Sequence, residues 1–592
     1  MFPCAWPLLA ALGVVVFAMV GSAHQQTVPS AIRLREYNAD VPKTILALQQ
    51  FRKTHSIRIK STAGREGVAI LVDLNPSINV WYLLEVTWND GTPARAYHLE
   101  NPNPHGRALL DEKYPSGVVI VEGTDRYSCD LFSAASPDLL EQGRDSRRIF
   151  YPLCESRLYL RNPAAGHHTA LEAATDFVRD RLWGGEKAIA LGHHLMGDAN
   201  RESGTIHTDA HAATRGEVDR RPGPLAALLD PAYTDRLVTS THLGISLEDA
   251  NATDLIPGVW YAARGNPGIY VSILQPKFIV PEIVQRRDTA NNLDEIEAAA
   301  LCYLIAFDLD QFELGYAGGT EHPGVEWSDH ILEQMKDPGL PGPDGIGSIA
   351  PLIATGLLSP ADLRRTVAVF TGGFKRTHGA FKQGELALRN HGSHYGFVEN
   401  GVVFSKLQPG LATIFALDDG SIGMKTWEEA DNQLLSRIKH ARQNGVPLVE
   451  FDEASQLSVP GRLVGRWGLG NWSGSEDVKL RTIRAAAAVQ NSAGKRFLIY
   501  AVFSSATPSA MARIFQAYRC QYAMLLDMNA LEHTYLAVYR RAEPQIAIEH
   551  LIKGMSVLDT ASAGQPVPRF VGYPDNRDFF YVMRRDVKAV WP

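Results

Sequence analysis

The sequence predicts an α+β fold in which a mixed β-sheet domain with helices follows a mostly β N-terminal domain. Two observations lead to this fold class. At 592 residues the chain is too long for one compact core, so at least two domains are expected. Within residues 225–592, short apolar runs typical of strands alternate with helical segments, without the strict spacing of βαβ units.

The first residues have the composition of a secretory signal peptide. Residues 7–20 are apolar and Gly21-Ser-Ala23 offers small residues for cleavage, so residues 1–23 are expected to be removed. The apolar run is shorter than the ~20 residues that cross a bilayer. No Lys or Arg precedes it, so an uncleaved anchor stays open as the alternative. We expect a periplasmic or secreted protein with no membrane span in the mature chain.

Residues 34–195 are predicted to form a mostly β accessory domain, to which no role is assigned. Residues 80–88 and 117–122 are rich in β-branched and aromatic side chains. Thr169 and Glu172 have the spacing of a capping box, which predicts a helix at the end of this domain.

The cysteines fit an exported protein. Cys129 and Cys154 lie in one polar region, and export permits disulfides, so these two are the expected pair. Cys302 lies in an apolar run, which favours a buried free thiol.

Residues 196–224 read as a linker because they are polar and end in a Pro/Gly-rich stretch. The linker contains His207, Asp209 and His211, which are metal-ligand types, but no rigid element surrounds them. A histidine-containing linker is therefore the preferred interpretation, and no metal or other cofactor is expected.

Residues 225–592 are predicted to form the second unit. Thr507-Pro-Ser followed by Met511-Ala-Arg-Ile-Phe515 has the pattern of a helix start and body, and Asp418-Asp-Gly420 that of a hairpin turn. The strand-like runs in this unit are residues 268–274, 299–308, 367–370, 411–417, 496–503 and 523–527.

Asp527 is the strongest carboxylate candidate for catalysis. It follows the apolar run Ala523-Met-Leu-Leu526, so it should emerge where a buried strand ends, and partial desolvation there can tune its pKa. Asn529 would share its face if the strand continued. A cap or a turn is the structural alternative for Asp527. Glycoside chemistry needs a second acid or nucleophile, for which Asp578 is the candidate, unless it pairs with Arg577 or caps a turn.

A second cluster of candidates follows the run Val367-Ala-Val-Phe-Thr. Gly372 and Gly373 permit a tight turn or a close backbone approach, and Phe374 comes next. Lys375 and the distant Arg577 could contact a phosphate, and His378 could donate a proton to a leaving oxygen. A solvated turn is the alternative for Lys375 and His378. His391 and His394 have spacing that could suit a metal, but the glycines around them indicate a loop.

An ordered series of motifs resembles the phosphodiester glycosidase family, and within it a divergent bacterial branch. The resemblance covers about residues 298–585. The motifs are Thr371-Gly-Gly-Phe-Lys375, Leu411-Ala-Thr-Ile-Phe415 with Asp419-Gly420 and Trp427, Leu525-Leu-Asp-Met-Asn529 and Arg577-Asp-Phe-Phe580. The sequence departs from the family at Thr371, where the family usually has Asn, and at Met528 and Asn529, where glycines are common.

The resemblance implies an exported hydrolase that cleaves a sugar from a sugar phosphodiester in envelope or extracellular glycans. Thr371 and the unclear second carboxylate favour a different class, a non-catalytic glycan-binding or polysaccharide-assembly protein on the same fold. A weaker alternative is a metal-dependent phosphoesterase that uses the histidines named above. The expected partner is a glycan or sugar phosphate, because a net charge of −7 argues against a nucleic acid.

Overall fold

The computed structural model describes residues 44–132, 138–169, 204–208, 223–248, 250, 255–382, 384–388, 392, 396–466, 480–542, 545–562 and 565–585. The predicted signal peptide, most of the predicted linker and the helix expected before Gly184 lie outside these residues. The division into residues 34–195, 196–224 and 225–592 therefore stays a prediction.

The predicted α+β class is wrong, because the protein is mostly β. In the described part of the chain, strands take 42% of residues and helices 15%. The named strands there pair only antiparallel, so the sheets are not mixed either. The described helices are short: α2 (Leu139–Asp145), α5 (Pro281–Val284), α6 (Glu295–Ala299), α7 (Gly384–Leu388) and α8 (Pro508–Ala517).

One strand that the sequence analysis did not predict shows how tertiary packing overrides intrinsic propensity. The run Thr482–Ser492 contains four consecutive alanines, which favour helix intrinsically. It nevertheless forms the long strand β24 between two antiparallel neighbours, because all four alanines are fully buried and their small side chains let the layers on both faces pack closely. Tertiary packing therefore overrides propensity here.

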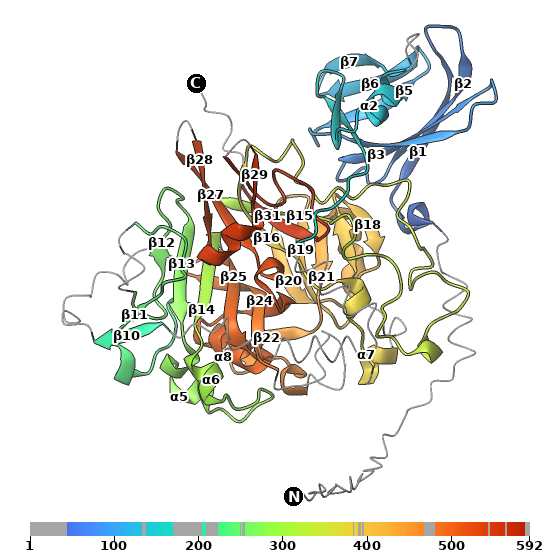
Figure 1. Cartoon of the computed structure of the whole chain (residues 1–592). Helices are drawn as coiled ribbons and strands as arrows, with labels where there is room; N and C mark the ends of the chain where they lie inside the picture. Colours follow the sequence, from blue (N-terminus) through green and yellow to red (C-terminus); the bar gives the residue numbers. More distant parts are fainter. Residues whose placement is uncertain are drawn as a thin grey trace, which may run out of the picture. The chain divides into compact units, whose positions relative to one another are not determined.

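The largest sheet has eight strands in the order β12-β13-β14-β25-β24-β26-β22-β23, and its central strands lie side by side in Figure 1. They are β12 (Tyr261–Ala262), β13 (Ile269–Leu274), β14 (Cys302–Asp308), β25 (Lys495–Ala506), β24 (Thr482–Ser492), β26 (Tyr522–Met528), β22 (Pro447–Asp452) and β23 (Leu457–Pro460). The expected helix after Thr507 is present as α8, and the Thr507 side chain caps it. It packs against β22, β23 and β25.

Two five-stranded sheets complete this part of the chain. One has the order β15-β31-β16-β27-β28 and the other β18-β17-β21-β19-β20. The first consists of β15 (Phe312–Ala317), β31 (Phe579–Arg584), β16 (Thr366–Thr371), β27 (Leu536–Ala542) and β28 (Gln545–His550). The second consists of β18 (Val402–Ser405), β17 (Phe397–Glu399), β21 (Ile438–Gln443), β19 (Ala412–Leu417) and β20 (Ile422–Thr426). Gly420, in the left-handed region, turns β19 into β20.

Residues 44–161 form two further sheets. Their strands are β1 (Lys53–Lys60), β2 (Glu66–Asp73), β3 (Trp81–Trp88), β4 (Arg95–Glu100), β9 (Leu158–Arg161) and β8 (Phe150–Leu153) in one sheet, and β5 (Gly106–Asp111), β6 (Tyr114–Glu122) and β7 (Asp125–Asp130) in the other. The two-stranded pairs are β10 (Thr205–Thr208) with β11 (Arg236–Thr239), and β29 (Thr560–Ser562) with β30 (Gln565–Val567).

Residues 44–161 have their own apolar core but also bond to later parts of the chain. Cys129 forms the predicted disulfide with Cys154, with the two Cα atoms 5.4 Å apart. Arg161 Nη2 donates to the carbonyl of Ile353 at 3.1 Å, and Gln49 Nε2 donates to that of Val403 at 2.7 Å.

Two other sequence predictions can be compared with the described residues. Cys302 is a buried free thiol, as expected. Within the described part of the chain, no helix is long and apolar enough to cross a membrane.

Candidate functional site

The ends of two neighbouring strands bring the Gly-Gly turn and the Arg577-Asp578 motif together. β16 pairs antiparallel with β31, with Thr371 opposite Phe579, so the residues after β16 lie beside the residues before β31. The Gly372 amide donates to the Asp578 carbonyl at 2.9 Å. About 200 residues of sequence therefore separate two motifs that strand register makes adjacent.

The two glycines are required by close packing. A Cβ atom on Gly372 would lie 2.4 Å from Asp578 Oδ2, and one on Gly373 would lie 2.5 Å from Asn444 Oδ1. Neither residue is in the left-handed region, so the constraint is space rather than backbone conformation.

Asn444 connects this turn to the strand that carries Asp527. Its Oδ1 accepts from the Phe374 amide at 3.0 Å, and its Nδ2 donates to the carbonyls of Leu525 at 2.7 Å and Leu526 at 3.1 Å. The end of β26 therefore joins the same site. Two motifs predicted from separate stretches of sequence, the Gly-Gly turn and the Asp527 strand, therefore meet around one buried amide.

Asp527 forms a buried ion pair with Arg577. Its Oδ2 accepts from Arg577 Nη1 at 2.6 Å, and its Oδ1 accepts from the Met528 amide at 2.8 Å. The side chains of Asp527 and Arg577 are only 8% and 6% exposed. Burial raises the pKa of Asp527 to about 6, and the positive charge of Arg577 opposes this rise.

His533 extends this pair into a chain of hydrogen bonds. Its Nδ1 lies 2.6 Å from the Met528 carbonyl, which can only accept, so Nδ1 carries the proton. The other ring nitrogen, Nε2, lies 2.7 Å from Arg577 Nη2 and accepts from it. His533 is therefore a neutral imidazole that orients the guanidinium of Arg577 toward Asp527.

Asp578 faces a different set of partners. Its Oδ2 accepts from Arg442 Nε at 2.8 Å and from the Tyr316 hydroxyl at 3.1 Å, and the residue is 1% exposed. Arg442 Nη2 also donates to the Phe374 carbonyl at 2.7 Å. Asp578 thus holds the Gly372–Phe374 turn through Arg442. Arg577 and Asp578 are neighbours in sequence and form two separate ion pairs.

Beyond the effect of burial, the charges of Arg577 and Lys375 lower the pKa of Asp527, and that of Asp578 raises it. Lys375 is buried and His378 half-buried, both just after the Gly-Gly turn. His322 is 9% exposed, and burial together with the charges of Lys375, Arg577 and His378 holds the pKa of its imidazole well below its usual range. The Arg376 amide donates to the carbonyl of Pro323 at 2.8 Å, which fixes the His322 loop beside Lys375. The arrangement suits an anionic group.

Asn529 does not share a strand face with Asp527 as predicted, and Thr371 makes a structural contact. β26 ends at Met528, and Asn529 adopts a left-handed backbone with φ of 83°, so strand alternation does not align it with Asp527. The Thr371 hydroxyl donates to the His533 carbonyl at 2.8 Å, so it serves to connect two segments of the chain.

The sequence interpretation missed Asn444, Arg442, His533 and His322. Arg442 and Asn444 end a stretch, Ile438-Lys-His-Ala-Arg-Gln-Asn444, that has no recognisable motif. The only usable signal was a series of polar residues in a segment of strand length. Their importance depends on burial, which sequence alone does not give.

The metal interpretations find no support in the described residues, among which no group of three or more His, Cys, Asp or Glu could hold a metal ion. Asp209, His211, His391 and His394 lie outside the described residues, and His207 lies in β10.

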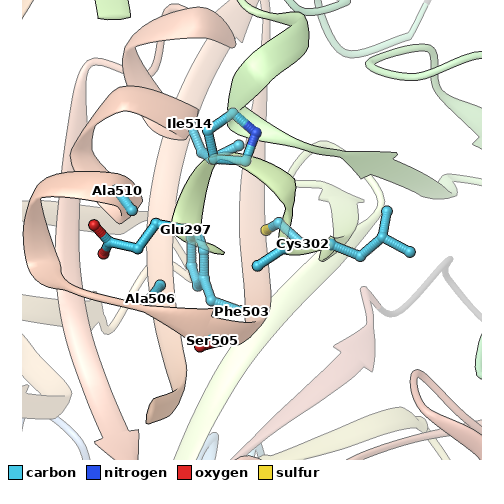
Figure 2. Close-up of a pocket in the computed structure, with 10 residues that line it drawn as sticks. Glu297, Cys302, Phe503, Ser505, Ala506, Ala510 and Ile514 are labelled. Atoms are coloured by element: carbon cyan, nitrogen blue, oxygen red, sulfur yellow. The ribbon is translucent and has the colours of Figure 1, made fainter. Parts of the chain in front are cut away.

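A separate small cavity lies under α8, and Figure 2 shows Glu297, Cys302 and Ser505 around it. Its volume of about 10 Å³ is enough for roughly one water molecule. Its lining contains none of the residues predicted for catalysis or binding, and a cavity of this size is too small for a sugar.

Comparison with known proteins gives only distant likenesses. No family model and no curated protein matches the chain. The catalytic domain of zebrafish N-acetylglucosamine-1-phosphodiester alpha-N-acetylglucosaminidase, auto-inhibited by its pro-peptide, has 11% identity and a TM-score of 0.28, with 64% of this chain and 95% of that chain covered.

Two further structures are similarly distant. A hypothetical protein from Synechocystis has 10% identity and a TM-score of 0.23, covering 85% of this chain and 97% of that chain. An exported protein from Burkholderia pseudomallei has 10% identity and a TM-score of 0.17, covering 48% and 74%. TM-scores this low do not establish a common fold, so function must be argued from the side chains themselves.

Proposed function

We propose that the protein is an exported hydrolase that cleaves a sugar from a sugar phosphodiester. The observation that supports this most directly is the buried Asp527–Arg577 pair set among Lys375, His378 and His322. A carboxylate whose pKa is raised to about 6 can exchange a proton near neutral pH. The positive charges of Arg577 and Lys375, which both act on Asp527, match the charge of a phosphodiester, whereas the depressed pKa of His322 keeps that imidazole neutral.

In the proposed reaction, Asp527 takes a proton from water as the water oxygen bonds to the anomeric carbon of the sugar. The bond between that carbon and the phosphate oxygen breaks, and its electron pair leaves with the phosphate. The products are the free sugar and a phosphomonoester. Lys375 and Arg577 balance the charge that develops on the phosphate, and His378 lies in the same electropositive region to hydrogen-bond the leaving oxygen.

This substrate class also accounts for the missing second acid. An alcohol leaving group needs a strong proton donor, which is why most glycosidases use two carboxylates. A phosphomonoester has its second pKa near ~6 and leaves without full protonation. Asp578 is then free to serve the role that its geometry suggests, which is to position the Gly372–Phe374 turn through Arg442.

The test is release of free sugar from N-acetylglucosamine-1-(methyl phosphate) by the full-length mature chain. Wild-type protein should release sugar, and Asp527→Asn should not. An uncharged methyl glycoside of the same sugar is the matched substrate control, and its turnover should be far slower because it lacks the phosphate. Equal turnover of both substrates would show that the cations do not recognise phosphate.

A second function, glycan binding without turnover, is favoured by one observation. The Thr371 hydroxyl is bonded to the His533 carbonyl, so the position where the resembling family usually has Asn supplies a structural contact. If wild-type protein binds the phosphodiester but releases no sugar over days, this binding function replaces the hydrolase.

A further inference from the structure

Residues 166–169, which follow the N-terminal sheets in the chain, are bonded to the loops that carry the candidate site. The His167 amide donates to the Pro574 carbonyl at 3.0 Å, and the His167 carbonyl accepts from the Asn576 amide at 3.4 Å. This parallel bridge lies outside the named strands. It attaches the segment directly to the residues that precede Arg577.

The segment lies so close to these loops that Gly166 has no room for a side chain. A Cβ atom on Gly166 would lie 2.1 Å from Thr320 Oγ1 and 2.7 Å from the Asn576 amide nitrogen. One of these two atoms belongs to the backbone, so an added methyl group would push the segment away from the loops. The segment is therefore packed against the site loops over more than one residue.

The His168 side chain connects two of the loops. Its Nδ1 lies 3.1 Å from Asn576 Nδ2, which can only donate, so Nδ1 accepts. The proton is then on Nε2, which donates to Glu321 Oε1 at 2.9 Å. Asn576 is fully buried, and its carbonyl accepts from the amides of Glu321 at 3.1 Å and His322 at 3.0 Å. His168 thus completes a ring of hydrogen bonds between the loops of His322 and Arg577.

Thr169 reaches a third loop of the site. Its hydroxyl donates to Glu532 Oε2 at 2.6 Å, and Glu532 directly precedes His533, which orients the guanidinium of the site. Each of the three side chains bonded by residues 168–169 therefore directly precedes a residue of the candidate site. The pairs are Glu321 with His322, Glu532 with His533, and Asn576 with Arg577.

We propose that His168 is a positioning residue of the candidate site, which fixes the loops of Arg577 and His322 through its bonds to Asn576 and Glu321. This inference rests on the proposed function, in which Arg577 balances the charge of the phosphate. A cation whose geometry is fixed in advance binds an anion with a smaller loss of conformational entropy. The N-terminal part of the chain would then complete the site as well as precede it.

The kinetic test compares His168→Ala with wild type in the full mature chain. KM for N-acetylglucosamine-1-(methyl phosphate) should rise about threefold to tenfold, as expected for one lost hydrogen bond, and kcat should change less than about twofold. KM for the uncharged methyl glycoside should not change. His168→Gln should restore most of the lost affinity, because its amide can accept from Asn576 and donate to Glu321. A purely structural role would instead affect both substrates alike.

Two further variants keep the test independent of folding defects. The His168 side chain is 32% exposed, so its removal leaves no buried cavity and the variant should fold. His105→Ala is the matched control, because His105 is an exposed loop residue, and it should behave as wild type. Gly166→Ala should raise KM for the phosphodiester while His168 is still present, whereas Gly554→Ala should not.

Hydrogen exchange separates this inference from the proposed hydrolysis. In His168→Ala, the amides of residues 319–323 and 574–577 should exchange about threefold faster or more, whether or not the protein releases sugar. Faster exchange and weaker binding of N-acetylglucosamine-1-phosphate, in a protein that releases no sugar, would reject the hydrolase and support the positioning role. Unchanged exchange in both loops, or an unchanged KM in an active His168→Ala variant, would overturn the proposal.

Discussion

The two ends of β26 differ in how they treat polar side chains. At the start, Tyr522 is 7% exposed, and burial raises the pKa of its phenol well above the usual range, so it stays neutral. At the end, Asp527 is enclosed with Arg577, and burial raises the pKa of its carboxylate to about 6. Both ends of the strand are therefore buried, but only the Asp527 end carries a group that can change its protonation state near neutral pH, which suits proton transfer.

Replacing the Asp527 carboxylate should have the largest effect on the rate of sugar release. Asp527→Asn keeps the shape of the side chain but cannot take a proton, so sugar release should fall by about 10²–10⁴-fold or more. The measurement is the initial rate on the sugar-1-phosphodiester. Asp418→Asn is the control, since Asp418 lies in an exposed turn and pairs with Arg437. A wild-type rate in Asp527→Asn would contradict the assignment.

Raising the pH should deprotonate the Asp527 carboxylate and thereby increase kcat/KM. Because Asp527 acts as a base with a pKa of about 6, kcat/KM should rise about tenfold for each pH unit up to pH 6 and level off above it. A profile that is flat between pH 4.5 and pH 7 would exclude Asp527 as the base.

The free energy of unfolding should fall over the same pH range in which kcat/KM rises. In the folded state Asp527 binds its proton more tightly than in the unfolded chain, where its pKa is near 3.8. As pH rises from about 4 to 6, wild type therefore loses about 3 kcal/mol of unfolding free energy, and Asp527→Asn does not. The stability of the variant relative to wild type should thus improve with pH, as measured by urea unfolding at pH 4 and pH 7.

Substitutions of Lys375 and Arg577 should separate binding of the phosphate from the chemical step. Lys375→Ala and Arg577→Lys should raise KM for the phosphodiester about tenfold or more, because an Arg fork and a buried Lys bind an anion strongly. KM for the uncharged glycoside should change much less. Arg437→Ala removes an exposed arginine, 46% accessible, and should leave both constants unchanged. Equal effects on both substrates would show that these residues act only through the fold.

Gly372→Ala should show the smallest change in chemistry and a clear change in stability. The added Cβ would meet Asp578 Oδ2 at 2.4 Å, so the turn or the Asp578–Arg442 pair must shift, at a cost of about 1–3 kcal/mol. Gly554→Ala is the matched control, because its Cβ would meet only a flexible leucine methyl group at 3.2 Å. Similar unfolding midpoints for the two variants would mean that the turn has room to relax.

The sequence by itself determined local features that depend on few neighbours. The helix after Thr507 follows from its cap and its proline, and the Gly420 turn from Asp-Asp-Gly. The Cys129–Cys154 pair follows from two cysteines in one short region. Asp527 near the end of an apolar strand was also readable from the run before it, although the buried stretch continues through Met528.

Only the tertiary structure decided the fold class and the partners of the site. The alanine run of β24 became a strand because the strands on both sides bury it, a constraint that propensity cannot express. Arg577 pairs with Asp527 and Asp578 with Arg442 because the register of β16 against β31 sets where each side chain points. The raised pKa of Asp527 comes from burial by segments far apart in sequence, and burial is a property of the packed chain rather than of any one motif.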